Sequence, residues 1–337
     1  MMIKTLSPQA IRLLALIAVL VLVLAFFASQ IDNYFNARLF TRISTSVAIM
    51  AIIACAQTIV MLARQIDLSV GSITGFTAFA AGSLIAQYPG LGGVPLALYA
   101  MVIGAGFGLV NGVIVAWLRV PAIIVTLATM AIFRSLLVEF SGAKSITTAS
   151  LPEWLTRFPN TVLFRVGALE FRAVVVLAVA VVVAVYLVLA FLRPARRLYA
   201  VGSNPEAAEM AGINQRLVIL LAFVASGALA GLAGFIFLAR FGNITVVAGL
   251  GFELKSVAAA VVGGVSINGG SGSVLGALVG AVLVDTIDQS LVRWPLVSEF
   301  WREAVLGLLI LLAVAADAVL GRRLMAMRIR REREKRA

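Results

Sequence analysis

The 337-residue chain contains no histidine, a single cysteine and few charged residues, which make up 12% of the sequence. The absence of histidine excludes a histidine metal cluster and a histidine general base. The lone Cys55 excludes a disulfide within the chain, and its place in an apolar run favours a small buried residue. Without histidine or a convincing nucleophile–base pair, an intramembrane enzyme is disfavoured, and no cofactor or metal site is expected.

What the chain has in excess is apolar residues, which make up 62% of it. A soluble domain of this length needs a more polar surface, and repeated apolar runs of about 18 residues or more are typical of transmembrane helices. The runs do not alternate polar and apolar residues as barrel strands do. The sequence therefore predicts an all-α, polytopic membrane protein with about ten transmembrane helices. We expect them at residues 11–28, 43–63, 67–86, 94–117, 121–139, 173–192, 217–240, 252–268, 271–290 and 301–320.

The distribution of basic residues predicts how these helices are oriented. If the N-terminus is cytoplasmic, 16 of the 27 Lys and Arg residues lie inside, 9 lie outside and 2 fall within helices. This excess follows the positive-inside rule and places both termini in the cytoplasm. The first apolar segment is either an uncleaved helix or part of a signal peptide. Its length and the poor cleavage site at residues 30–32 favour an uncleaved helix.

The chain divides into a transmembrane domain, residues 1–321, and a basic cytoplasmic tail, residues 322–337. The tail has eight basic and two acidic residues, which favours an anchor near anionic membrane lipid over a nucleic-acid or regulatory arm. The loop at residues 140–172 falls on the outside. Its LPEWLTRFP run is compatible with an interfacial helix that holds Trp154 at headgroup level and with a docking surface for an external partner.

A short acidic helix is predicted between the sixth and seventh spans, in the cytoplasmic segment GSNPEAAEMAGIN. Asn204 and Pro205 suit the N-cap and the first turn, and Glu206 and Glu209 lie where the helix dipole favours negative charge. Gly212 suits a left-handed C-terminal cap. About two turns of helix are marginal alone in water, so this helix is expected to pack against something.

The run EAAEMAG has the form E-A-A-x-x-x-G, and it resembles the coupling-helix motif in permease subunits of binding-protein-dependent ABC importers. The resemblance implies that residues 204–214 sit in a groove on a separate ATPase subunit and carry its motion to the membrane helices. A capped surface helix without a partner is the alternative, but a place between two spans on the basic side favours coupling. The implied coupling residues are Asn204, Pro205, Glu206, Ala207, Ala208, Glu209 and Gly212.

Further stretches resemble the sugar-importer branch of that family, which includes permeases for ribose, xylose, arabinose, rhamnose and autoinducer-2. They are RQIDLSVGSITGF, GVIVAWLRVPAIIVTLATM and ELKSVAAAVVGGVSINGGSGSVLGALVGA, and the resemblance extends over residues 45–320. It implies a pore-forming permease of the bacterial inner membrane. The implied partners are an ATP-binding ABC subunit, a periplasmic sugar-binding protein and a second permease, either the same chain or a paralogue. The C-terminal run SEFWREAVLGLLILLAVAADAVL is more similar to rhamnose and autoinducer-2 permeases than to ribose permeases.

Two other segments are candidates for a gate, a hinge or the pore. GGVSINGGSGSVLG lacks the Lys-Ser/Thr ending of a P-loop, so ATP hydrolysis is expected in another subunit. Its small residues favour close helix packing and a bend, and the alternative is polar side chains on the solute path. Asp67 has two interpretations. The favoured one is structural, as a helix cap or a contact with Arg64, and the alternative is functional, as part of a gate. The candidate residues are Asp67, Ser69, Gly71, Asn268, Ser271, Gly272 and Ser273.

Charged residues predicted inside spans are few, and Arg134, Asp285, Asp288 and Asp317 stand out among them. Each costs about 2.5–3.5 kcal/mol at the bilayer centre when unpaired, so they must face protein, water or the interface. The spacing of Asp285 and Asp288 favours a paired structural network over a proton relay. A proton-coupled carrier typically has a clearer ionisable pathway. The sequence thus favours an ATP-driven importer over the alternative, an ion-coupled secondary transporter for a small polar solute.

Overall fold

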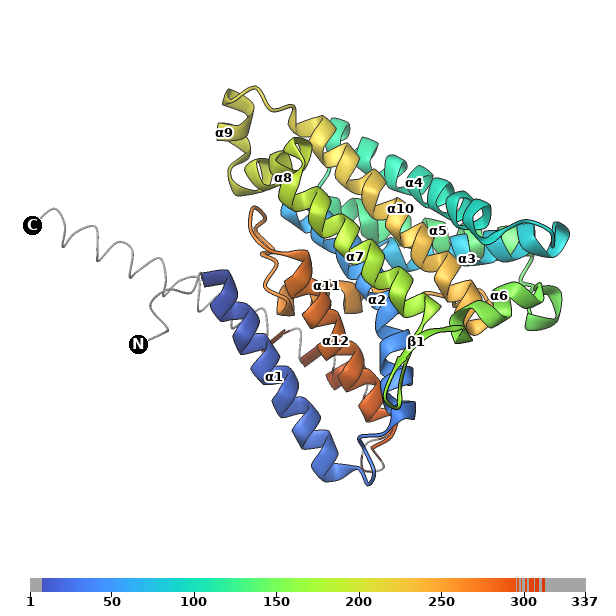
Figure 1. Cartoon of the computed structure of the whole chain (residues 1–337). Helices are drawn as coiled ribbons and strands as arrows, with labels where there is room; N and C mark the ends of the chain where they lie inside the picture. The colour runs from blue at the N-terminus through green and yellow to red at the C-terminus, as the bar shows by residue number, and fades with distance from the viewer. Residues whose placement is uncertain are drawn as a thin grey trace, which may run out of the picture.

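The computed structural model describes residues 8–294 and, beyond them, residues 296, 298, 301, 303–305, 307, 308, 311 and 312. The described chain is a bundle of long helices with short elements at its two ends (Figure 1). The elements are α1 (Pro8–Gln30), α2 (Ala37–Leu62), α3 (Val70–Gln87), α4 (Gly93–Leu118), α5 (Ala122–Ser141), η2 (Thr148–Ser150), α6 (Glu153–Arg157), η3 (Phe158–Asn160), β1 (Val162–Val166), β2 (Leu169–Arg172), α7 (Ala173–Phe191), α8 (Arg193–Ser203), α9 (Pro205–Met210), α10 (Gln215–Phe241), α11 (Phe252–Val262) and α12 (Val274–Leu291).

Eight helices in the described residues are long and apolar enough to cross a membrane: α1, α2, α3, α4, α5, α7, α10 and α12. They correspond to eight of the predicted spans. The span expected at 252–268 differs, because α11 has only 11 residues and the chain turns at Gly263, well short of the roughly 20 residues that a helical span needs. Most of the span expected at 301–320, Asp317 and the tail at 322–337 lie outside the described residues.

The core of the bundle is built around α2 and α10. Every residue of α2 from Val47 to Leu62 is buried, and α2 packs against α10, α12, α7 and α11. Helix α10 lies along α4 at very short distance: a Cβ added to Gly104 or Gly108 would collide with the α10 backbone. Small residues at four-residue spacing allow the two backbones to approach closely. In lipid, helices gain no hydrophobic free energy by associating, and close van der Waals packing of this kind stabilises their contact instead.

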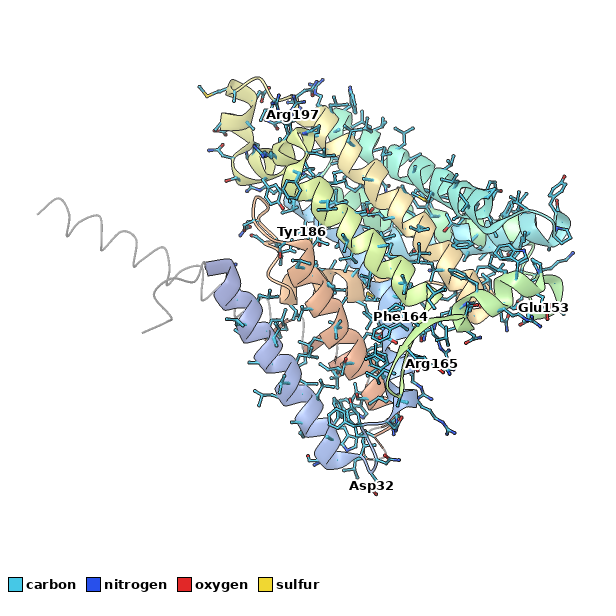
Figure 2. The ribbon with its side chains drawn as sticks, in the orientation of Figure 1. Asp32, Glu153, Phe164, Arg165, Tyr186 and Arg197 are labelled. Atoms are coloured by element: carbon cyan, nitrogen blue, oxygen red, sulfur yellow. The ribbon has the colours of Figure 1, made fainter. Side chains whose placement is uncertain are left out.

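Short elements mark two opposite ends of the bundle. Helices α8 and α9 lie at one end, and α6 and the β1–β2 hairpin lie at the other (Figure 1). Figure 2 shows Arg197 at the first end, and Glu153, Arg165 and Asp32 at the second. Residues 140–172, predicted from the sequence to form one loop, contain α6 and the hairpin and lie at the second end. The hairpin was not predicted from the sequence; it pairs antiparallel strands, and Phe164 stacks on Phe171 with ring centroids 4.7 Å apart.

The chain between α10 and α11 folds back onto α3 and α5. Nη1 of Arg134, on α5, donates hydrogen bonds to the carbonyl oxygens of Val246, at 3.0 Å, and Ala248. Helix α11 then packs closely on α12, where a Cβ at Gly276 or Gly280 would meet the α11 side. The close packing that the small residues predicted here is confirmed at Gly276 and Gly280.

Two of the charged residues inside the spans, Asp285 and Asp288, have polar partners on other helices. Nζ of Lys255, on α11, lies 3.1 Å from Oδ2 of Asp288, and both side chains are largely buried. Oδ1 of Asp285 accepts a hydrogen bond of 2.8 Å from Ser46 Oγ. The predicted structural network at Asp285 and Asp288 is confirmed for these contacts, and it links α12 to α11 and α2. The partners offset part of the cost of burial, and Oδ2 of Asp285 is buried without a hydrogen-bond partner among the described residues.

Candidate coupling surface and interior network

Helix α9 has both of its predicted caps. Oδ1 of Asn204 accepts a hydrogen bond from the Ala207 N–H at 3.0 Å, and Pro205 occupies the first turn. At the other end Gly212 has a left-handed backbone with φ +77°. The N–H of Ile213 donates to the carbonyl oxygen of Ala208 at 3.0 Å, which closes the last turn. These bonds satisfy backbone groups that a six-residue helix otherwise leaves exposed.

The two faces of α9 differ sharply. Ala208 is 4% exposed and packs with Val201 and Val218, so it faces the protein. Glu206 and Glu209 are exposed on the helix, and Met210 is 91% exposed. Residues three and four apart share a helix face, which groups Glu206, Glu209 and Met210. Sequence reasoning missed Met210, although its spacing from Glu206 was a signal, and it included Ala208, which the fold turns inward.

A groove of about 790 Å³ lies beside α9. Its walls are α9, the turn between α4 and α5, and the first turn of α10. Glu206 and Glu209 stand on one side of it, and Arg119 and Arg216 also line it. The groove therefore presents both signs of charge. Nε2 of Gln215 donates to Glu209 at 3.2 Å, which holds α9 against α10.

Helix α8 connects α9 to the core through a contact that admits no side chain. A Cβ at Gly202 would collide with the Leu62 carbonyl oxygen and the Gly270 nitrogen. The Gly270 N–H donates to that same carbonyl oxygen at 3.1 Å. On the same helix, burial raises the pKa of the Tyr199 hydroxyl. The last turn of α8 thus meets both the end of α2 and the loop before α12, a junction that sequence reasoning missed.

The candidate gate residue Asp67 lies in a buried hydrogen-bond network. Its Oδ1 accepts from the Ser69 N–H at 2.9 Å and from Ser69 Oγ at 2.6 Å, and its Oδ2 accepts from Ser226 Oγ at 3.1 Å. Nδ2 of Asn111 donates to Ser69 Oγ at 2.8 Å. The bonds to Ser69 hold the turn that leads into α3, but no side-chain hydrogen bond caps that helix, and Arg64 is exposed. The network ties the α2–α3 turn to α4 and α10.

The other candidate gate or hinge residues divide into two surroundings. Gly71 is buried in the first turn of α3, and a Cβ there would collide with Glu253 and the Gly249 carbonyl oxygen. Ser273 caps α12, since its Oγ accepts from the Gly276 N–H at 3.0 Å. Two more, Asn268 and Ser271, are exposed in the loop before α12, where Gly272 has φ +145°. The structure therefore does not gather the seven residues into one site.

Eight long apolar helices in the described part of the chain, with polar residues bonded between them, are typical of a multi-pass membrane protein. Residues 39–314 match the family described as "Branched-chain amino acid transport system / permease component", and the chain belongs to this family. It is a transport component of the bacterial inner membrane and not itself an enzyme.

The curated relatives agree over most of the chain. The chain is 38% identical over 301 residues to the Autoinducer 2 import system permease protein LsrC of Yersinia enterocolitica, covering 88% of this chain and 81% of that one. It is 36% identical over 285 residues to the protein of the same name from Yersinia pseudotuberculosis, covering 85% and 78%. No solved structure matches. The resemblance to permeases of ABC sugar importers is thereby confirmed.

Proposed function

We propose that the chain forms the pore of an ATP-driven importer for a monosaccharide-like solute, and that this solute is of the autoinducer-2 type rather than a pentose or rhamnose. The names of the relatives support the choice of solute, because they are 36–38% identical over 85–88% of this chain. In this proposal residues 1–321 are the permease domain. A periplasmic binding protein delivers the solute at the end that carries α6 and the hairpin.

The single observation that carries the coupling proposal is the exposed face of α9. Glu206, Glu209 and Met210 project from a helix that is capped at both ends and fixed to the core by Ala208. A short capped helix that exposes the apolar side chain of Met210 and two carboxylates suits docking in a groove on another protein. That protein is the ATPase, whose motion reaches α2 and the loop before α12 through the Gly202 junction.

A second permease subunit completes the pore in this proposal. The outward faces of α4, α5 and α7 expose many large apolar side chains, among them Leu118, Ile124 and Val179. Such surface lies against lipid or against another membrane subunit. Whether that subunit is a second copy or a paralogue follows from purification of the assembled importer.

Disulfide or bifunctional crosslinking tests the docking of α9. Met210→Cys, in a complex with the ATPase, is expected to crosslink to it, and Ala207→Cys to do so more weakly. Ala208→Cys is the matched control, since residue 208 is 4% exposed and faces the core. The buried Cys55 leaves the unmodified chain as a blank. Crosslinking at 208 but not at 210 would contradict the proposed docking face.

Reconstituted uptake separates the proposal from its alternative. Liposomes with the chain, its ATPase and its binding protein are expected to accumulate autoinducer-2 with ATP and to stop with vanadate. Glu206→Ala combined with Met210→Ala is expected to leave the protein in the membrane but abolish ATP-driven uptake. Accumulation driven by an ion gradient without an ATPase, and lost on adding an uncoupler, would instead establish a secondary transporter. Retention of ribose or rhamnose, but not autoinducer-2, by the cognate binding protein would reject the solute.

A further inference from the structure

A pocket rich in arginine lies at the end of the bundle opposite α9. It has a volume of about 450 Å³ and is bordered by the first turns of α2, the hairpin and the end of α10. Arg38 and Arg42 come from α2, Arg172 from β2 and Arg240 from α10, and Glu170 contributes one negative charge. These arginines stand at the end where the positive-inside rule predicts few basic residues, so orientation in the membrane does not account for them.

Hydrogen bonds hold two of the four arginines, Arg240 and Arg172, in place. Nη1 of Arg240 donates to the Thr45 carbonyl oxygen at 2.9 Å, and Nη1 of Arg172 donates to Asn160 Oδ1 at 2.7 Å. Glu170 lies 3.5 Å from Nη2 of Arg172. Four guanidinium groups beside one carboxylate give the pocket a net positive charge, which favours an anionic ligand with several acceptor oxygens.

An apolar groove continues from this pocket along the bundle. Its volume is about 710 Å³, and it shares Ala37 and Ala168 with the arginine pocket. Its walls come from α1, α2, α7 and α12, with Leu24, Val179 and Val282 among them. All four helices are candidate membrane spans. The groove therefore lies at the depth of the hydrocarbon, whereas the arginines lie at the end of the spans.

We propose that the pocket and the groove together bind one anionic phospholipid, with its phosphate among the arginines and an acyl chain in the groove. Guanidinium groups bind phosphate oxygens through paired charged hydrogen bonds. The four arginines exceed the single Glu170, so an anionic lipid fits better than a zwitterionic one. A free phosphate leaves the groove empty, and a carboxylate of a docking protein does the same. A phospholipid has a charged headgroup and an apolar chain in one molecule, so it can fill both adjoining cavities at once.

Lipid retention by the purified full-length chain tests the site. Native mass spectrometry in detergent, with phosphatidylglycerol and phosphatidylcholine added in turn, is expected to show preferential retention of phosphatidylglycerol. Arg38→Gln combined with Arg42→Gln is expected to weaken that binding about 10- to 30-fold, because it removes two of the four guanidinium groups of the pocket. Ala168→Trp fills the junction without changing charge and is expected to weaken binding as well. If Ala168→Trp fails to fold, Leu24→Trp is the second variant: it fills the groove from α1 and is expected to weaken binding in the same way.

Arg157→Gln is the matched control. Arg157 lies at the same end, is largely exposed and pairs with Glu153 outside both cavities. Equal retention of the two lipids by the unmodified chain overturns the proposal. So does phosphatidylglycerol binding that glycerol phosphate displaces and that Ala168→Trp and Leu24→Trp leave unchanged, because the pocket then binds anions alone. Unchanged lipid retention in the arginine variant, with loss of binding-protein docking, assigns the surface to that protein instead.

Discussion

Gly202 has no room for a side chain, because a Cβ there would collide with the Leu62 carbonyl oxygen and the Gly270 nitrogen. Gly202→Ala is therefore expected to push α8 away from α2 and to lower the free energy of unfolding by about 1–3 kcal/mol. Thermal unfolding in detergent measures the loss, and ATP-driven uptake is expected to fall with it. Gly106→Ala is the control, since a Cβ there meets nothing within 4 Å. Equal melting of the two variants would contradict the tight junction.

The carboxylate of Asp67 acts only as an acceptor, and three donors from Ser69 and Ser226 point at it. Asp67→Ala removes both acceptor oxygens and leaves the three donors without them. Leaving buried donors unsatisfied costs about 1–3 kcal/mol, so this variant is expected to melt at lower temperature and to fold in lower yield. Asp32→Ala makes the same change at an exposed position and is expected to melt as the unmodified chain does. A stable Asp67→Ala protein without transport would favour the gate role over the structural one.

Among the elements, α9 depends on its N-cap because six residues make few internal hydrogen bonds. Asn204→Ala removes the bond to the Ala207 N–H, and such a loss costs about 1 kcal/mol. The helix is expected to fray at its first turn, so the ATPase hydrolyses ATP with less uptake per ATP. Asn204→Asp keeps an acceptor oxygen and is expected to restore the ratio. A ratio unchanged by Asn204→Ala would mean that the ordered first turn is not needed for coupling.

The sequence predicted α9 and its caps because those signals are local: Asn204, Pro205 and Gly212 act within a few residues of one another. It could not predict which face of α9 is free, since burial of Ala208 depends on Val201 and Val218. It also missed the end of α11 at Gly263, where the close approach of Gly276 decides the geometry. Likewise, the main partners of Asp67 include Ser226, which is 159 residues away along the chain. Pattern and composition fix spans and caps, whereas non-local packing fixes hinges and networks.

For the whole molecule, the two ends of the bundle are expected to face opposite sides of the membrane. Glu153 is exposed at one end, and Met210 is 91% exposed at the other. The only cysteine, Cys55, is 1% exposed, so single cysteines can be introduced without removing it. An impermeant maleimide added to intact spheroplasts is expected to label Glu153→Cys. It is expected to label Met210→Cys only after permeabilisation.

The labelling of the two cysteines also tests the coupling proposal. Labelling of Met210→Cys from outside would place α9 away from any cytoplasmic ATPase, and the coupling proposal would fail whatever the family relationship. Labelling of both positions only after permeabilisation would put the arginine pocket on the cytoplasmic side as well. A single candidate span, α7, lies between α6 and α9 in the chain, so that outcome would mean that α7 does not cross the membrane. Labelling at the two positions together therefore tests whether α7 crosses the membrane.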